Sequence, residues 1–382
     1  MTVEQLLNDG WQFCKLPLGS TLEDVSNAAL QAVDLPHDFL IENENDLYET
    51  TDAWYLRTLD VPESWCASCV LVRFDGVYMD CDVLLNGHVV CTHHYGYTAF
   101  DVDLTSRLLV GRNTLAVHIR HQSPNSRWYS GAGIYRDVTL HVLPKRHIPL
   151  DGVYVTTTHE LESWTITIDT ELCVVKDNGV LTHVLLDGDV PVCDVTVEAA
   201  GDHANAVMQV LSPKLWSPDA PNVYTLQTML GNQVIRQNVG FRDLTFTTDR
   251  GLLVNGAPVK LHGVCLHHDL GCLGSAFHEK AMRRQLRAMR QMGVNALRTS
   301  HNPPAKQVMD LCDELGIFVV DEAFDMWLRA KTPFDYARFF PTDMPSDVAT
   351  WVRRDRNHPS LLMWSIGNEI LDTHLDESAQ QV

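Results

Sequence analysis

The residues best suited to chemistry stand near the C-terminal end of the chain, where an apolar run leads directly to an amide and a carboxylate. Residues 361–366 read Leu-Leu-Met-Trp-Ser-Ile, and Gly367, Asn368 and Glu369 follow. Such a run predicts a buried strand, which would deliver the carboxyl group at its end into a site. A carboxyl group held in this way can give a proton to a leaving group and later act as a base. Glu369 is therefore the candidate catalytic residue.

Three more candidates stand at or just beyond the ends of other apolar runs. Arg298 and His301 close one such run, and Asp269 follows another. In a barrel of parallel strands, active sites lie at the carboxyl ends of the strands, which is where these side chains would be. Plainer roles stay open on the residues alone: a surface salt bridge for Arg298, a helix cap for His301 and a solvated loop position for Asp269.

The elements that must position these side chains alternate between strand and helix. Apolar residues recur at helical spacing from Met282 to Met289, and Gly293 can end that helix. Asn302 as N-cap and Pro303 as first helical position predict the start of the next helix. Four apolar runs predict strands, at 259–266, 294–299, 317–320 and 361–366. Alternation of this kind predicts a parallel sheet.

A closed (β/α)₈ barrel has eight such units and about 250 residues. The pattern therefore predicts an incomplete TIM barrel of about four of the eight βα units over residues 249–382. An open half-barrel would leave strand edges and an apolar interior uncovered, so the chain either pairs with another chain or is an incomplete copy of a longer protein. We expect the second, a truncated copy that is inactive alone.

The first two thirds of the chain show short alternating strands instead. Residues 1–145 predict a β-sandwich of jelly-roll type, with a hairpin signal at Asn86-Gly87. Residues 146–248 repeat the pattern at the size of an immunoglobulin-like β-sandwich. The predicted fold class is thus multidomain, β followed by α/β.

Composition narrows the classes of partner. The 382 residues are 45% hydrophobic, which is enough for a large core, and 29 basic against 49 acidic residues give a formal charge of −20. Such a surface repels phosphate backbones and anionic lipid, so neither nucleic acid nor membrane is an expected partner. Ten cysteines without a framework spacing, and an N-terminus without a signal-peptide core, predict free thiols in the cytoplasm.

Several long motifs, in the same order along the chain, resemble those of glycoside hydrolase family 2. They stand at 33–38, 128–138, 215–226, 239–242, 293–304, 320–325 and 361–369. The resemblance implies a retaining β-glycosidase, which needs two carboxyl groups about 5–5.5 Å apart. One of them is Glu369, the family's general acid and base, whose pKa is expected to be raised by burial and by the neighbouring nucleophile. The nucleophile itself is absent from this sequence.

The resemblance also assigns substrate contacts. It implies that Asn368 bonds the sugar 2-hydroxyl, that His301 donates to the sugar and that Arg298 partners the nucleophile. Asp269 resembles a substrate-contacting carboxylate of the related glucuronidases. Trp327 is weighed equally as a sugar-stacking platform and as core packing.

The neighbouring carboxylates Asp321 and Glu322 are not expected to form a catalytic pair. Consecutive residues of a strand point to opposite faces, so the two cannot face one substrate, and we interpret them as support for the site. The family's lactase-like members carry a histidine a little further along this loop, where residues 323–327 differ.

Metal and cofactor chemistry is not expected from these residues. A cluster of ligand types at His262, Cys265, His267, His268 and Cys272 lacks zinc-site spacing, and no metal ligand is assigned. Cys66 and Cys69 form a C-x-x-C without the βαβ unit of redox proteins. The resemblance to the lactase-like enzymes implies a Mg²⁺ site in the complete enzyme, with its other ligands outside this sequence.

The predicted function is hydrolysis of terminal β-galactosides in carbohydrate metabolism, with a carbohydrate as the partner. The resemblance of residues 264–269 to galactosidases favours a galactosidase over a β-glucuronidase, which is the alternative within the family. No Arg or Lys besides Arg298 is expected at a strand end, where a sugar carboxylate would need such a partner. A non-catalytic carbohydrate-binding fragment is the alternative from another class. Whether the complete protein forms a homo-oligomer stays open.

Overall fold

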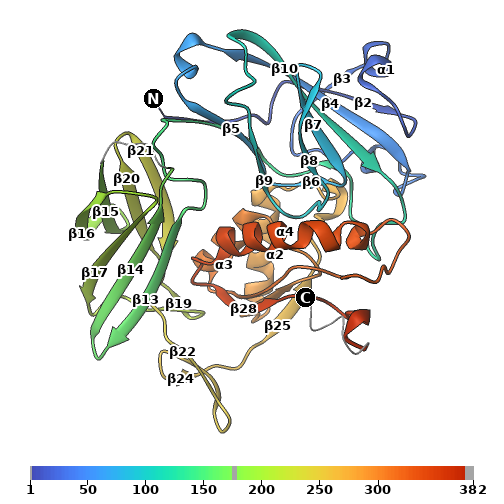
Figure 1. The fold of residues 1–382 in the computed structure, drawn as a ribbon. Coiled ribbons are helices and arrows are strands. Elements are labelled where there is room, and N and C mark those ends of the chain that lie inside the picture. The colour runs from blue at the N-terminus through green and yellow to red at the C-terminus, as the bar shows by residue number, and fades with distance from the viewer. Residues whose placement is uncertain (1, 174–178, 375–382) are drawn as a thin grey trace.

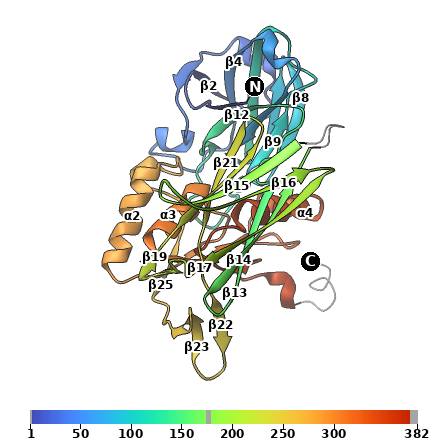
Figure 2. The same cartoon turned by 90° about the vertical axis from the view of Figure 1, so that its left-hand side faces the viewer.

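The computed structural model describes residues 2–173 and 179–374, which form two β-sandwiches and a layer of helices on a parallel sheet. In Figure 1 the first sandwich lies above the helices and the second lies beside them. Figure 2, turned by 90°, shows the small strands β22 and β23 at the opposite end from the first sandwich. The predicted fold class is confirmed. None of the described helices is long and apolar enough to cross a membrane.

The first sandwich is built from a six-stranded and a four-stranded antiparallel sheet. Alternation puts Val70, Val72 and Phe74 into the core between the sheets. The six-stranded sheet runs β3 (Gln31–Val33), β2 (Trp11–Leu16), β4 (Thr51–Val61), β10 (Gly111–His121), β7 (Cys81–Leu85) and β8 (His88–His93). The other runs β1 (Val3–Leu6), β12 (Val138–Leu143), β5 (Cys69–Phe74) and β9 (Phe100–Asp103).

A hairpin, a short strand pair and a loop complete the first sandwich. The predicted Asn86-Gly87 hairpin joins β7 to β8, and both residues have positive φ, +51° and +83°, as a two-residue hairpin turn requires. The short strands β6 (Val77–Tyr78) and β11 (Gly133–Ile134) pair with each other. The loop between β10 and β11 leads toward the helical layer, as described below.

The second sandwich has seven main strands, as the immunoglobulin-like prediction requires. One sheet runs β13 (Val153–Glu160), β14 (Ser163–Glu171) and β17 (His203–Leu211). The other runs β16 (Val190–Ala199), β15 (Gly179–Asp187), β20 (Tyr224–Leu230) and β21 (Gln233–Val239). Trp164, Ile166 and Ile168 of β14 alternate into the core between them.

The barrel portion begins after a small sheet of β22 (Leu244–Thr247), β23 (Gly251–Val254) and β24 (Ala257–Pro258). Four parallel strands then lie side by side in chain order: β25 (Gly263–Leu266), β26 (Ala296–Thr299), β27 (Phe318–Glu322) and β28 (Leu361–Ser365). The connecting helices are α2 (Glu279–Gln291), α3 (Lys306–Leu315) and α4 (Phe340–Asp355). The predicted parallel sheet is confirmed.

Two predicted boundaries in this region are wrong. The first strand begins at Gly263 and not at Val259, because the Val259 amide donates to Leu252 of β23 and belongs to the preceding small sheet. The helix expected from Asn302 begins at Lys306. Pro303 is itself followed by a proline, which disfavours the α conformation at Pro303 and delays the helix.

Aromatic and other apolar side chains fill the junction between the first sandwich and the barrel portion. Tyr95 and Tyr97 of the sandwich pack with Phe324, Tyr336 and other residues of the barrel loops. The Tyr95 hydroxyl donates to the carbonyl of Ala323, directly after β27. The ends of the barrel strands are therefore fixed against the first sandwich.

Candidate active site

The carboxyl ends of the four parallel strands carry the polar residues that the sequence singles out. His301 follows β26, Glu322 is the last residue of β27, and Asn368 and Glu369 follow β28. Arg298 points from within β26 toward the same group. The structure therefore brings Arg298, His301, Asn368 and Glu369 to one edge of the sheet.

Glu322 is the most fully bonded member of the group. Its side chain is 1% exposed. Arg298 donates through Nε at 3.1 Å and through a terminal nitrogen at 2.7 Å, and His301 Nδ1 donates at 2.7 Å. The Ser365 hydroxyl of β28 adds a bond of 2.7 Å. Burial acts to raise the pKa of Glu322, but these bonds from His301, Ser365 and Arg298 outweigh it and lower the pKa.

Asp321 faces the other way, as the strand alternation predicts. Its carboxylate accepts from Trp351 Nε1 of α4 at 2.8 Å, on the helical side of the sheet. Burial, with the charge of Asp355 beside it, raises the pKa of Asp321 well above its ordinary value. Only one of the two neighbours therefore faces the strand ends.

Asn368 connects two groups of charged residues. Its oxygen accepts from Arg298 at 2.9 Å, and its Nδ2 donates to Asp325 Oδ1 at 2.8 Å. Asn368 is nearly buried, so both bonds fix the plane of its amide. A sugar hydroxyl in this position would meet an amide that cannot turn.

Asp325, which the sequence reasoning did not select, is held by two cations. Arg127 donates to both carboxylate oxygens, at 2.6 and 3.0 Å, and Lys331 Nζ donates at 3.0 Å. Its side chain is 1% exposed. Burial acts to raise the pKa of Asp325, but the bonds from Arg127, Asn368 and Lys331 lower it overall.

Glu369 differs from the expectation of a buried acid with a raised pKa. Its side chain is 70% exposed, and a hydrogen bond of 2.9 Å from Arg127 lowers its pKa. The raised pKa was wrong for this structure because the described residues place a cation beside Glu369 and do not bury it. Its φ of +45° is a backbone conformation that a non-glycine residue seldom adopts and that is most frequent at functional sites.

The remaining candidates lie around this group without joining it. Asp269 is half-buried and makes no side-chain hydrogen bond within the described residues. His267, two positions earlier, has its ring 5.4 Å from that of His301. Trp327 is buried, and its Nε1 donates to the carbonyl of Ile366. Its platform role is wrong in this structure, and its alternative as core packing is confirmed.

Arg127 and Trp128 were missed because they belong to the first sandwich. They stand in the loop between β10 and β11, where Trp128 is the first residue of the 128–138 motif and Arg127 directly precedes it. The Trp128 ring lies 5.2 Å from His267 and 5.4 Å from His301. An Arg-Trp pair in a loop was the available signal, but nothing in the sequence placed that loop at the barrel strand ends.

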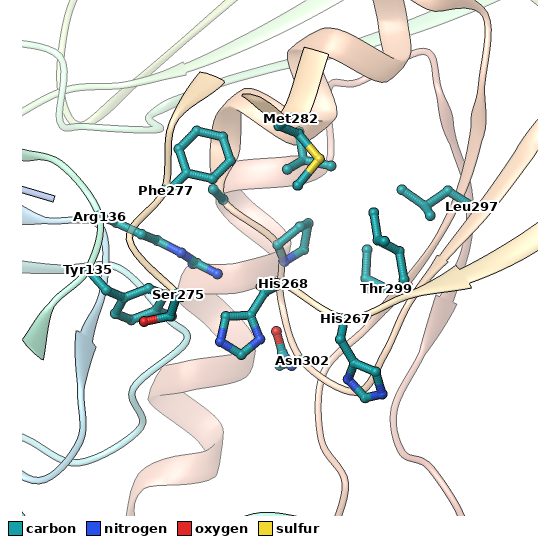
Figure 3. A pocket seen from close by; sticks show the side chains of 14 residues that line it. Tyr135, Arg136, His267, His268, Ser275, Phe277, Met282, Leu297, Thr299 and Asn302 are labelled. Carbon is teal, nitrogen blue, oxygen red and sulfur yellow. The ribbon is translucent and has the colours of Figure 1, made fainter. Parts of the chain in front are cut away.

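A small cavity lies just behind the strand ends (Figure 3). Arg136 of the first sandwich and His268, Ser275 and Asn302 of the barrel loops line it. Its volume of about 20 Å³ holds about one water molecule, so it is too small for a sugar. The exposed group around Glu369 is the better candidate site.

The described residues do not suit Mg²⁺ beside Glu369. The guanidinium of Arg127 already pairs with both Asp325 and Glu369. A divalent cation would have to displace that charge. The ligand-type cluster from His262 to Cys272 does not gather into a metal-binding set within the described residues.

One set of metal-binding residue types does come together, far from the strand ends. Asp310 and Asp313 of α3 lie near His358. Asp313 already accepts from His358 Nδ1, Asn238 Nδ2 and the Ser360 amide. These hydrogen bonds give the group of Asp310, Asp313 and His358 a structural explanation.

All ten cysteines are unpaired, as predicted.

Comparison with protein families matches almost the whole chain to three models of one family. The sugar binding domain of the glycosyl hydrolases family 2 matches residues 4–144, a second domain of that family matches 147–242, and its TIM barrel domain matches 246–379.

Curated relatives carry two kinds of name. The β-galactosidase BoGH2A of Bacteroides ovatus is 37% identical over 91% of this chain and 44% of its own length. A putative β-glucuronidase of Formosa agariphila is 32% identical over 100% of this chain and 38% of its own length. The chain thus spans less than half the length of these relatives.

Solved structures agree with the fold. A glycosyl hydrolase family 2 member from Bacteroides cellulosilyticus superposes with a TM-score of 0.92 at 32% identity, over 99% of this chain and 53% of that one. A β-glycosidase from Bacteroides vulgatus gives a TM-score of 0.90 at 33% identity, over 99% and 51%.

Proposed function

Because the chain belongs to glycoside hydrolase family 2, we propose that it is part of a retaining β-glycosidase that hydrolyses terminal β-galactosides, with Glu369 as general acid and base. The observation that supports this most is the place of Glu369. Its carboxylate stands at the end of a barrel strand, exposed to solvent and next to an immobilised Asn368.

The proposed reaction has two steps. In the first, Glu369 protonates the oxygen of the leaving group while a second carboxylate, supplied by a further part of the barrel, attacks the sugar. In the second, the Glu369 carboxylate takes a proton from a water molecule whose oxygen attacks the anomeric carbon, and the bond between the sugar and the second carboxylate breaks, which releases the sugar. A nucleophile 5–5.5 Å away would raise the pKa of Glu369 and so oppose the effect of Arg127.

The other residues fit supporting roles. Asn368 and His301 would bond the sugar hydroxyls, and Asp269, which follows β25, would contact the substrate from that side. One side of the Arg298 guanidinium is already used in hydrogen bonds to Glu322. We propose that Arg298 contacts the nucleophile only through the side of the guanidinium that remains.

The structure removes one of the arguments from the sequence for a galactoside as the substrate. A galactoside was favoured partly because no cation beyond Arg298 was expected at the strand ends. The structure places Arg127 and Lys331 there, and a sugar carboxylate is recognised by such groups. That argument was wrong. The choice of a galactoside therefore rests on the resemblance of residues 264–269 to galactosidases and on the name of the Bacteroides ovatus relative. The two cations favour β-glucuronides as the second candidate.

A leaving-group series tests the acid/base role in the complete enzyme. Glu369→Gln should lower kcat/KM about 10²- to 10⁴-fold for aryl glycosides with poor leaving groups, and far less for activated ones that need no protonation. Azide should restore turnover of the activated substrates. Glu198→Gln, an exposed change in the second sandwich, serves as control. Equal losses across the series would rule out the role.

A substrate panel tests the sugar. The nitrophenyl β-galactoside should give the highest kcat/KM among galactoside, glucuronide, glucoside and mannoside. A preference for the glucuronide would replace the proposed sugar and leave the mechanism standing. Carbohydrate binding without any turnover by the complete protein would favour the non-catalytic alternative.

A further inference from the structure

The first sandwich supplies one side chain that touches the candidate acid/base residue directly. Arg127 extends from the loop between β10 and β11, and a terminal nitrogen lies 2.9 Å from Glu369 Oε2. The two residues are 242 positions apart in the chain. Their contact joins a domain matched as sugar-binding to the end of a barrel strand.

The guanidinium of Arg127 is held in one orientation. Its Nε and one terminal nitrogen bond the two oxygens of Asp325, at 3.0 and 2.6 Å. A bidentate pair of this kind fixes the plane of the guanidinium as well as its position. Asp325 is itself fixed by Asn368 and Lys331. The remaining terminal nitrogen therefore has one direction available, and it points at Glu369.

The loop that carries Arg127 is also fixed on both sides. Before it, the carbonyl of Pro124 accepts from the Phe334 amide, and Gln122 accepts from Arg338 at 3.0 Å. After it, Trp128 packs on His267 and His301. The approach of Arg127 to Glu369 follows from contacts on each side of it and does not depend on one flexible side chain.

Building on the proposed function, we propose that Arg127 is a positioning residue for Glu369, so that the first sandwich is an integral part of the catalytic centre. In the first step Glu369 gives up its proton and becomes a carboxylate. That carboxylate is the form that Arg127 binds, so the contact strengthens as the proton leaves. Arg127 stays charged throughout, because Asp325 keeps its partner charge.

The pairing has a second consequence for the protonated state. A protonated Glu369 has lost most of its attraction to Arg127 and can turn toward the leaving oxygen. The returning carboxylate is drawn back to the same guanidinium before it acts on water. Arg127 would thus place the same carboxyl group for both of its roles.

The test compares Arg127→Met with wild type in the complete enzyme, using an aryl glycoside with a poor leaving group. We expect kcat/KM to fall about 10- to 100-fold, the size of effect that misplacing a catalytic group produces. The basic limb of the pH profile should move to higher pH, since removal of the cation raises the pKa of Glu369. Arg127→Lys, which cannot bridge both carboxylates, should shift the limb in the same direction and by less.

A matched control exists on the helices. Arg283 also bridges two carboxylates, Glu279 and Glu314, but lies on α2 away from the strand ends. Arg283→Met should leave the pH profile unchanged. If the basic limb stays at the same pH in both Arg127 variants, Arg127 only holds the two domains together, and the proposal is overturned.

A measurement without turnover separates this proposal from the proposed function. The carboxyl ¹³C signal of Glu369, assigned through Glu369→Gln, should titrate at higher pH in Arg127→Met than in wild type. That shift, together with equal losses across the leaving-group series, would keep the pairing and remove the acid/base role. An unshifted titration, with the leaving-group effect intact, would keep the acid/base role and remove Arg127.

Discussion

Two glutamates at the ends of adjacent strands, Glu322 and Glu369, have opposite surroundings. Glu322 is 1% exposed and accepts from Arg298, His301 and Ser365, whereas Glu369 is 70% exposed and, among residues 2–173 and 179–374, is bonded only by Arg127. The pKa of each is lowered, but for different reasons: a set of hydrogen bonds that outweighs burial at Glu322, and a single ion pair at Glu369.

The difference distinguishes a carboxylate that supports the site from one that is able to react. A carboxylate whose oxygens are all bonded within the protein has no capacity left for a substrate proton. One that is held from a single side keeps a lone pair free for it. In the proposed mechanism, Glu369 is therefore distinguished from Glu322 by its number of fixed partners and not by its proximity to the site.

The largest expected effect is on stability, and it should appear at Glu322 only. Glu322→Ala leaves Arg298 and His301 without their acceptor and should lower the free energy of unfolding of the barrel portion by about 3 kcal/mol. Glu369→Ala should leave the urea midpoint unchanged. Urea unfolding followed by tryptophan fluorescence checks both, and a similar loss in the two variants would break the contrast.

A smaller effect is expected from Arg298→Lys. Lysine keeps the charge but cannot present the planar fork that bonds Glu322, so about 1–2 kcal/mol should be lost. Arg283→Lys, in an exposed ion pair on the helices, is the matched control and should change little. A wild-type midpoint in Arg298→Lys would mean that charge alone holds Glu322.

The smallest effect is a dependence on pH. Because the folded-state pKa of Glu322 lies below its ordinary value near 4.5, its stabilising contribution is complete above that value and is lost as the pH falls through the folded-state pKa. The difference in stability between wild type and Glu322→Gln should therefore shrink between pH 6 and pH 3. A difference that grows on acidification would contradict the lowered pKa.

Sequence reasoning reached the fold because periodicity is a local property. The change from alternating residues to helical spacing located the parallel sheet, and the Asn86-Gly87 turn was identified from two residues. It also placed Asn368 and Glu369 at a strand end. It failed at the start of α3, where Pro303 and Pro304 together delay the helix.

The surroundings of the site could not be predicted in the same way. Arg127 reaches Glu369 across 242 positions, and no periodic pattern records which loop of one domain meets which strand of another. The exposure of Glu369 was missed for the same reason, since burial depends on what packs around a strand end. Only the contacts that Lys331 and Asp325 make in the structure show that these two residues belong to the site.

The pairing of β1 with β12 sets the order in which this protein can be assembled. Val3 aligns with Val142, so the four-stranded sheet of the first sandwich cannot be completed until the ~140 residues between them are made, roughly 7 to 28 s of synthesis at about 5–20 residues per second. The barrel strands instead each pair with the next strand in the chain, over shorter separations in sequence. The loop of Arg127 lies inside the segment that β12 closes. A ribosome would thus present a finished sandwich that already contains the loop of Arg127 before it makes the strand that precedes Glu369.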